Sequence, residues 1–197
     1  MLIFDTVLKQ LPGNVPKQMI SDTFEFKLLS LHWLENMDEQ RDLCAHGALF
    51  VKIGNEILCD ADTFTITLSS AALHLMRSLA GNYTKDDYSS QLLPCCGFNF
   101  FAQSETDAVV NIMGCPSGID WTIIHTEDHK VRHITENGSE AEMDIEDYKT
   151  IVLDFADNIE AFYRSALPKD LSAVDEENRL GYAAFWKEWH KLRNAWK

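Results

Sequence analysis

The sequence predicts an α+β protein, in which an antiparallel sheet of hairpins carries one short helix and two long C-terminal helices. Up to about residue 143, apolar residues alternate with polar ones or form short runs bounded by turn residues, as strands do. Beyond that point they recur every three or four residues, as on the buried stripe of a helix. Strands first and long helices last favour helices on one face of an antiparallel sheet over a doubly wound parallel fold. We expect one globular domain over residues 1–197.

The first clear strand signal begins near residue 23. Phe24, Phe26 and Leu28 share one parity, and charged residues stand between them. This alternation is typical of a strand with one buried face, and it fades at Leu29.

Two hairpins and three further strands are predicted from turn residues and apolar runs. Gly54-Asn55 separates the runs 43–52 and 56–59, and Asn137-Gly138 separates 131–135 from 140–143. Asn and Gly tolerate the positive φ that tight hairpin turns require. The remaining apolar stretches are expected to be sheet and cover residues 93–102, 108–113 and 119–126.

Three helices are predicted from caps, apolar spacing and stop signals. Hydroxyl residues 67–70 precede an apolar stripe that ends before Gly81, which predicts a helix over 68–80. A second stripe predicts a helix over 145–166, followed by Pro168. A third helix runs from about residue 176 to the C-terminus, and its aromatic side is expected to be mainly core.

The charge balance disfavours nucleic acid as a partner. The chain has 31 acidic and 17 basic residues, a formal net charge of -14, and no Lys or Arg between Lys85 and Lys130. Such a field repels phosphate, whereas it favours rapid docking of a basic protein. No apolar run is long enough to span a membrane, so no membrane partner is expected.

The cysteines and the N-terminal residues predict a cytoplasmic location. The first residues carry no basic leader followed by a long apolar run, and five cysteines are an odd set in a chain of this size. We therefore expect reduced thiols.

One candidate catalytic region lies between residues 95 and 125. Cys95 and Cys115 are followed by turn residues that can present a thiol, and Asp120 and His125 supply polar groups nearby in sequence. A cysteine nucleophile needs a base and a depressed pKa, but no cation lies close in the sequence, so buried structural thiols are the competing interpretation. The usual nucleotide and hydrolase motifs are absent.

The histidines do not form a metal-binding pattern. His125, His129 and His133 are spaced by four, which aligns ligands on a helix, but their neighbours predict strands. A transition-metal site would draw on Cys44, His46 and these histidines, but no Cys-x-x-Cys or His-Glu-x-x-His pattern supports it. We therefore expect surface histidines, no metal site and no cofactor.

A run of carboxylates is the candidate surface for a basic partner. Helix-dipole compensation explains part of it, because several members fall in the first turn of the predicted helix over 145–166. The residues assigned to partner binding are Glu136, Glu140, Glu142, Asp144, Glu146, Asp147 and, near the end of the aromatic helix, Trp196.

The C-terminal third resembles small acidic bacterial proteins that are themselves uncharacterised. The resemblance rests on Phe155-Ala156-Asp157, Ile159-Glu160-Ala161-Phe162-Tyr163 and the aromatic segment 181–189. Some such proteins are similar to the immunity partners of secreted toxins. The resemblance implies a protein that binds a basic toxin domain in the cytoplasm of the producing cell and blocks its active site.

Three hypotheses follow. The sequence favours a non-enzymatic protein-binding domain, an immunity or regulatory protein that neutralises a basic partner. The alternatives are an enzyme of unknown class with a Cys/His/Asp site near residues 95–125, and a structural homo-oligomer closed by exposed aromatic residues.

Overall fold

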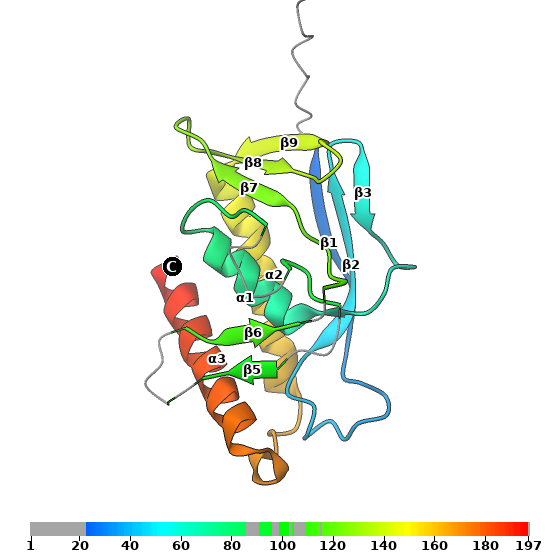
Figure 1. Cartoon of the computed structure of the whole chain (residues 1–197), viewed down its shortest axis with the longest axis vertical. Helices are drawn as coiled ribbons and strands as arrows, with labels where there is room; N and C mark the ends of the chain where they lie inside the picture. The colour runs from blue at the N-terminus through cyan, green and yellow to red at the C-terminus, as the bar shows by residue number, and fades with distance from the viewer. Residues whose placement is uncertain are drawn as a thin grey trace, which may run out of the picture.

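The structure is a computed structural model that describes residues 23–85, 91–95, 99–102, 104, 109–114 and 116–196. It is an α+β fold with three antiparallel sheets, one short helix and two long C-terminal helices, as predicted (Figure 1). In chain order the elements are β1 (Phe24–His32), β2 (His46–Ile53), β3 (Glu56–Cys59), β4 (Ile66–Thr67), α1 (Leu68–Ser78), β5 (Asn99–Phe101), β6 (Asn111–Met113), β7 (Thr122–His125), β8 (Lys130–Ile134), β9 (Glu140–Asp144), α2 (Ile145–Ser165), η1 (Leu171–Ala173) and α3 (Glu176–Ala195).

The largest sheet has β2 at its centre. β2 pairs antiparallel with β1, with β3 and, at its first residues, with β4. The hairpin turn between β2 and β3 uses Gly54 at φ +59°, the conformation that the Gly-Asn pair predicted. The register of β1 shifts between Leu28 and Ser30, which is where the alternation fades in the sequence.

The second sheet, β7-β8-β9, is an antiparallel meander. The predicted Asn-Gly turn joins β8 to β9, with Gly138 at φ +81°. This sheet is tied to the largest one, because the Ser139 hydroxyl donates to the Ile53 carbonyl oxygen at 2.7 Å.

β5 and β6 form a short ribbon beside α3 (Figure 1). The ring of Phe100 stacks on Phe185 of α3 at 4.6 Å between centroids. Close approach is possible because Gly181 has no side chain: a Cβ there would overlap the Phe100 carbonyl oxygen. Within the described residues, the strands expected over 93–102 and 108–113 are observed as β5 and β6.

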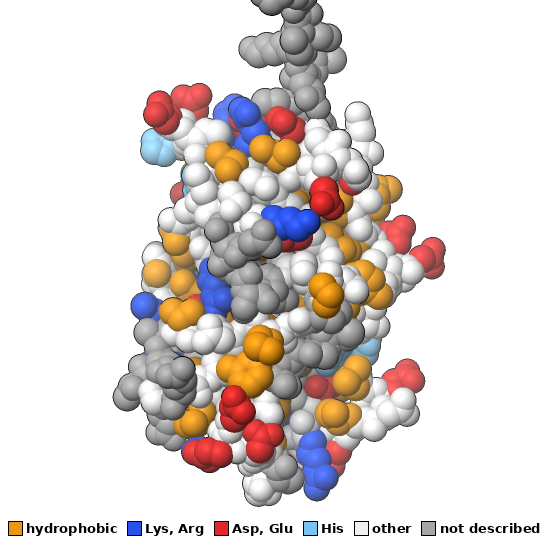
Figure 2. All heavy atoms as spheres, viewed as in Figure 1, with side chains coloured by type: hydrophobic (Ala, Val, Ile, Leu, Met, Phe, Trp, Pro, Cys, Tyr) orange, Lys and Arg blue, Asp and Glu red, His pale blue; other side chains and the backbone are white. Residues whose placement is uncertain are grey.

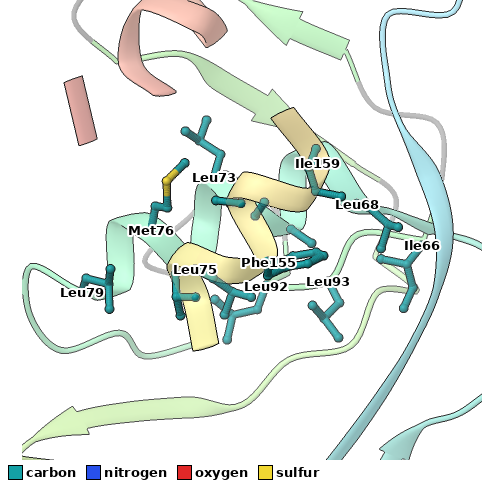
Figure 3. Packing of buried hydrophobic residues seen from close by; sticks show 14 of the residues in the cluster. Ile66, Leu68, Leu73, Leu75, Met76, Leu79, Leu92, Leu93, Phe155 and Ile159 are labelled. Carbon is teal, nitrogen blue, oxygen red and sulfur yellow. The ribbon is translucent and has the colours of Figure 1, made fainter. Parts of the chain in front are cut away.

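α1 is the centre of the core. All but one of its residues are buried, and its apolar side chains meet Phe155 and Ile159 of α2 (Figure 3). α2 and α3 begin at aspartate caps: Asp144 accepts from the Glu146 amide and Asp175 from the Asn178 amide. Among the described residues, no helix combines the length and apolar character that crossing a bilayer needs.

Candidate functional site

Asp120 anchors a loop to β7. Its carboxylate accepts from the Tyr83 hydroxyl at 2.9 and 2.8 Å, from the Leu92 amide at 3.2 Å and from the Trp121 amide at 3.1 Å. Burial raises the pKa of Asp120 above its usual value, although these hydrogen bonds act in the opposite direction. Asp120 also lines a cavity of about 240 Å³ between this loop and β8.

The other members of the predicted catalytic region are separately engaged. Cys95 is disulfide-bonded, so it is not the free thiol that a nucleophile needs, and the expectation of reduced thiols is wrong at this position. Cys115 lies outside the described residues. A ring nitrogen of His125 lies 2.8 Å from the Ser78 carbonyl oxygen, which fixes that imidazole against the end of α1. None of the described contacts joins His125 to Asp120 or Cys95.

His133 is fully buried, so the expectation of surface histidines is wrong for this residue. Its Nδ1 accepts from the indole N–H of Trp121 at 3.0 Å, and its ring stacks on Phe24 at 4.0 Å. Burial lowers its pKa to about 3. His133 is therefore a neutral core residue at pH 7.

A buried polar cluster lies at the start of β2, around Cys44 and His46, the two residues weighed above as metal ligands. Asp42 accepts from the amides of Leu34 and Cys44, and its carboxylate lies 3.4 Å from Nε2 of His46. Asp42, Cys44 and His46 line a hollow of about 370 Å³. Burial raises the pKa of Cys44 well above its usual value, so this thiol stays protonated. Only His46 of these three residues lies in a strand, so no strand periodicity in the sequence would have grouped them.

The predicted acidic run extends from the β8–β9 turn to the start of α2, but four of its members already have partners. Glu142 bonds Lys130 and Arg132, each at 3.1 Å, and these hydrogen bonds lower its pKa. Asp144 caps α2. The exposed Glu136 pairs with Lys85, and Glu140 opens β9 partly buried. The run is consequently less negative than its sequence suggests.

The exposed carboxylates continue along α2. We call Glu146, Asp147, Asp154 and Asp157 the α2 acidic face; all are exposed and lie at spacings that keep them on one side of the helix. Lys149 pairs with Glu146 at 3.1 Å and Arg193 with Asp157 at 2.6 Å. In the described part of the chain, no cation pairs with Asp147 or Asp154. Asp154 and Asp157 were not among the predicted partner-binding residues, although the apolar stripe of α2 marks them as outward-facing.

The face drawn in Figure 2 has a mixed charge pattern. On the face drawn in Figure 2, acidic side chains stand in small separate groups with cations and apolar side chains between them. This face carries no single continuous acidic field.

The aromatic helix is mostly core, as predicted. Phe185 and Trp189 are fully buried. Trp196 is half-buried, with the ammonium of Lys149 5.9 Å from its ring centroid, so it lies close to the α2 acidic face. Its assignment to partner binding stays a prediction.

A hollow of about 190 Å³ lies between β1 and α2, next to the α2 acidic face; we call it the β1–α2 hollow. Phe26 packs edge-on against Phe155 at 5.0 Å beneath it. The hollow thus has apolar walls and a polar rim; its lining residues are Phe26, Leu28, Ile151, Asp154, Phe155 and Asn158.

Comparisons with known proteins assign this chain to no family. No protein-family model matches it, and no curated protein or solved structure is significantly similar to it.

Proposed function

We propose that this chain is a non-enzymatic protein-binding domain that neutralises a basic partner, in an immunity or regulatory role. The observation that carries the proposal is the α2 acidic face, where Asp147 and Asp154 are exposed and no cation of the described residues pairs with them. The net charge of -14 adds a long-range field that speeds encounter with a basic protein. Such a partner supplies the missing countercharges.

The location in the cytoplasm is part of this proposal. The free thiols of Cys44 and Cys59 support it, and the disulfide at Cys95 speaks against it, because disulfides are rare in a reducing compartment. Alkylation of the protein in intact cells, followed by mass spectrometry, reports the redox state of Cys95 directly.

The enzyme alternative retains one favourable observation. Asp120 combines a raised pKa with a place in the wall of a cavity, as catalytic carboxylates often do. However, three backbone or hydroxyl donors already occupy its oxygens, and the Cys95 thiol is oxidised. A structural role accounts for Asp120 without chemistry, so we favour the binding function.

The test is retention of a basic protein by the immobilised full chain at low and high salt, with mass spectrometry of the retained species. We expect stoichiometric retention that is lost at high salt, because exposed charge pairs are screened. The informative variant is Glu146→Lys with Asp147→Lys at the start of α2, which should abolish retention.

α3 offers a matched control. It also begins with two exposed carboxylates, and Glu176 pairs with Arg179 much as Glu146 pairs with Lys149. Glu176→Lys with Glu177→Lys therefore makes the same change in charge and the same unfavourable change in helix dipole. Equal loss in both double variants, or retention that salt does not affect, contradicts an α2 binding surface.

A further inference from the structure

β1 is an edge strand of the largest sheet. It pairs with β2 on one side, and no described strand pairs with its other side. An edge strand of nine residues presents main-chain donors and acceptors to which another chain can add a strand.

The register identifies which of these groups point outward. The Gly54 amide donates to the Thr23 carbonyl oxygen at 2.9 Å, so Thr23 and Gly54 form a hydrogen-bonded pair. In an antiparallel ladder, hydrogen-bonded pairs alternate with non-hydrogen-bonded pairs. The amides and carbonyls of Glu25 and Lys27 therefore also point toward β2. The amides and carbonyls of Phe24, Phe26 and Leu28 therefore point away from β2.

The same residues place their side chains beside a receptive surface. Phe26 and Leu28 contribute to the β1–α2 hollow, whose volume of about 190 Å³ exceeds the roughly 150 Å³ of cavities that admit a benzene ring. Asp154 stands on its rim. Main-chain groups, an apolar hollow and an unpaired carboxylate thus lie next to one another along one edge.

We propose that the outer edge of β1 binds an extended segment of the basic partner as an added β-strand. An apolar side chain of that segment fills the β1–α2 hollow, and a Lys or Arg two positions away pairs with Asp154. The spacing of two follows from strand geometry, since only residues i and i+2 face the same side. This inference rests on the proposed function and specifies how the partner is held.

The charges of β1 favour this placement of the basic residue. On the opposite face of the strand, Lys27 and Lys52 both lie beside Glu25, at 2.8 and 3.7 Å. That face already has more cations than anions, so it repels a further Lys or Arg. Asp154 on the hollow side forms no ion pair with a cation of the described residues, although it interacts electrostatically with Arg193.

The test begins with selection of binding segments by the full chain from a display library of random peptides about nine residues long, the length of β1. We expect enrichment of sequences with an apolar residue and a Lys or Arg two positions apart. A selected peptide is then synthesised and added to ¹⁵N-labelled protein. Hydrogen exchange should slow at the amides of Phe24, Phe26 and Leu28, while the amides of Glu25 and Lys27, already bonded to β2, should change little.

Two substitutions of one exposed residue test the carboxylate. Asp154→Lys should lower the affinity for the selected peptide roughly tenfold, and Asp154→Glu should retain most of that affinity. Glu177→Lys on α3 makes the same charge change outside this surface and should have no effect. A peptide whose cation is moved by one position relative to its apolar residue presents that cation on the other face. It should bind the unmodified protein as weakly as the selected peptide binds Asp154→Lys.

The remaining outcomes separate this inference from the proposed function. If a basic ligand binds with salt sensitivity but no β1 amide responds, the inference is overturned and the proposed function stands. If selection enriches nothing and no basic protein is retained, both fail. Protection of the β1 amides that rises with protein concentration alone identifies a second copy as the occupant, and protection lost on deleting residues 1–22 identifies that segment; either result overturns a foreign partner strand.

Discussion

Buried charges in this protein depend on partners far away in the sequence. Glu188 of α3 is almost fully buried, and both its oxygens bond the Arg77 guanidinium, at 2.8 and 2.9 Å. The Val110 amide donates to the same carboxylate at 2.7 Å, and Arg77 donates to the Val110 carbonyl. A charge in such a place is tolerated only while every partner is present.

We therefore expect Glu188→Gln to lower the free energy of unfolding by about 3–5 kcal/mol, because it leaves the Arg77 cation buried without its counterion. Asp157→Asn is the matched change at the exposed pair with Arg193 and should cost about 1 kcal/mol or less. Urea unfolding of both variants measures the difference. Equal losses would contradict the role of burial.

His133 makes stability depend on pH. Its pKa is about 3 in the folded protein, whereas an unperturbed histidine has a pKa of 6.5. The unfolded chain therefore binds a proton more readily. The contribution of the neutral imidazole is fully present above pH 6.5 and is lost as the pH falls toward 3, at about 1.4 kcal/mol per pH unit. His74 behaves in the same way, for the same reason.

His133→Phe should lower the slope of the free energy of unfolding against pH, by the equivalent of up to one bound proton, between pH 6.5 and 5. This range lies above the pH at which most carboxylates titrate. At pH 7 the variant should be less stable by about 1–3 kcal/mol, because the Trp121 indole N–H loses its acceptor. Urea titrations at several pH values give both quantities. An unchanged pH slope would mean that folding does not lower the pKa of His133.

At the scale of elements, local signals predicted the helices well and the sheets only in part. α1, α2 and α3 begin at residues 68, 145 and 176, as their apolar periodicity indicated. The hydroxyl cap predicted for α1 is wrong, because the Thr67 side chain makes no capping hydrogen bond. The Gly54 and Gly138 turns were equally clear. Division into three sheets was not predictable, because strand pairing is set by contacts distant in sequence, and β4 has too few residues to give any pattern.

The candidate site was also predictable only in part, because it depends on contacts distant in sequence. Its charges were visible in the sequence from Glu136 to Asp147, yet which of them are neutralised depends on cations brought in by folding, such as Lys130 beside Glu142. The outward position of Asp154 follows from the apolar stripe of α2, but its place beside β1 follows only from the fold. Sequence alone can locate a charged segment, but it cannot show which partner groups surround it.

Gly181 tests the packing of the β5–β6 ribbon on α3. Gly181→Ala improves intrinsic helix propensity by about 1 kcal/mol, but the new methyl group overlaps the Phe100 carbonyl oxygen, at a cost of about 1–3 kcal/mol or more. We expect a net loss of stability. Gly81→Ala, where a Cβ meets nothing within 4 Å, should be almost neutral and serves as the control in thermal unfolding. A stabilised Gly181→Ala variant would show that the ribbon yields easily.

At the scale of the whole molecule, one cluster of buried apolar residues joins elements from all three sheets and from α1, α2 and α3. It contains Trp121 before β7 and Trp189 in α3. Because each element completes the burial of others, we predict that the described chain unfolds as one cooperative unit.

Fluorine NMR of protein labelled with 5-fluorotryptophan can follow Trp121 and Trp189 separately through a urea titration. Coincident midpoints are expected. An earlier transition at Trp121 would assign β7–β9 to an independent folding unit and divide the single domain that the sequence predicts.

Asp144 ends β9 and also caps α2, so no linker residues separate the strand from the helix. The strand and the helix are therefore joined without a flexible connection. A partner that pulls on α2 transmits its load at once to the β8–β9 ladder, from the Lys130–Asp144 pair onward. The α2 acidic face and the β7-β8-β9 sheet should therefore respond to force as one rigid unit.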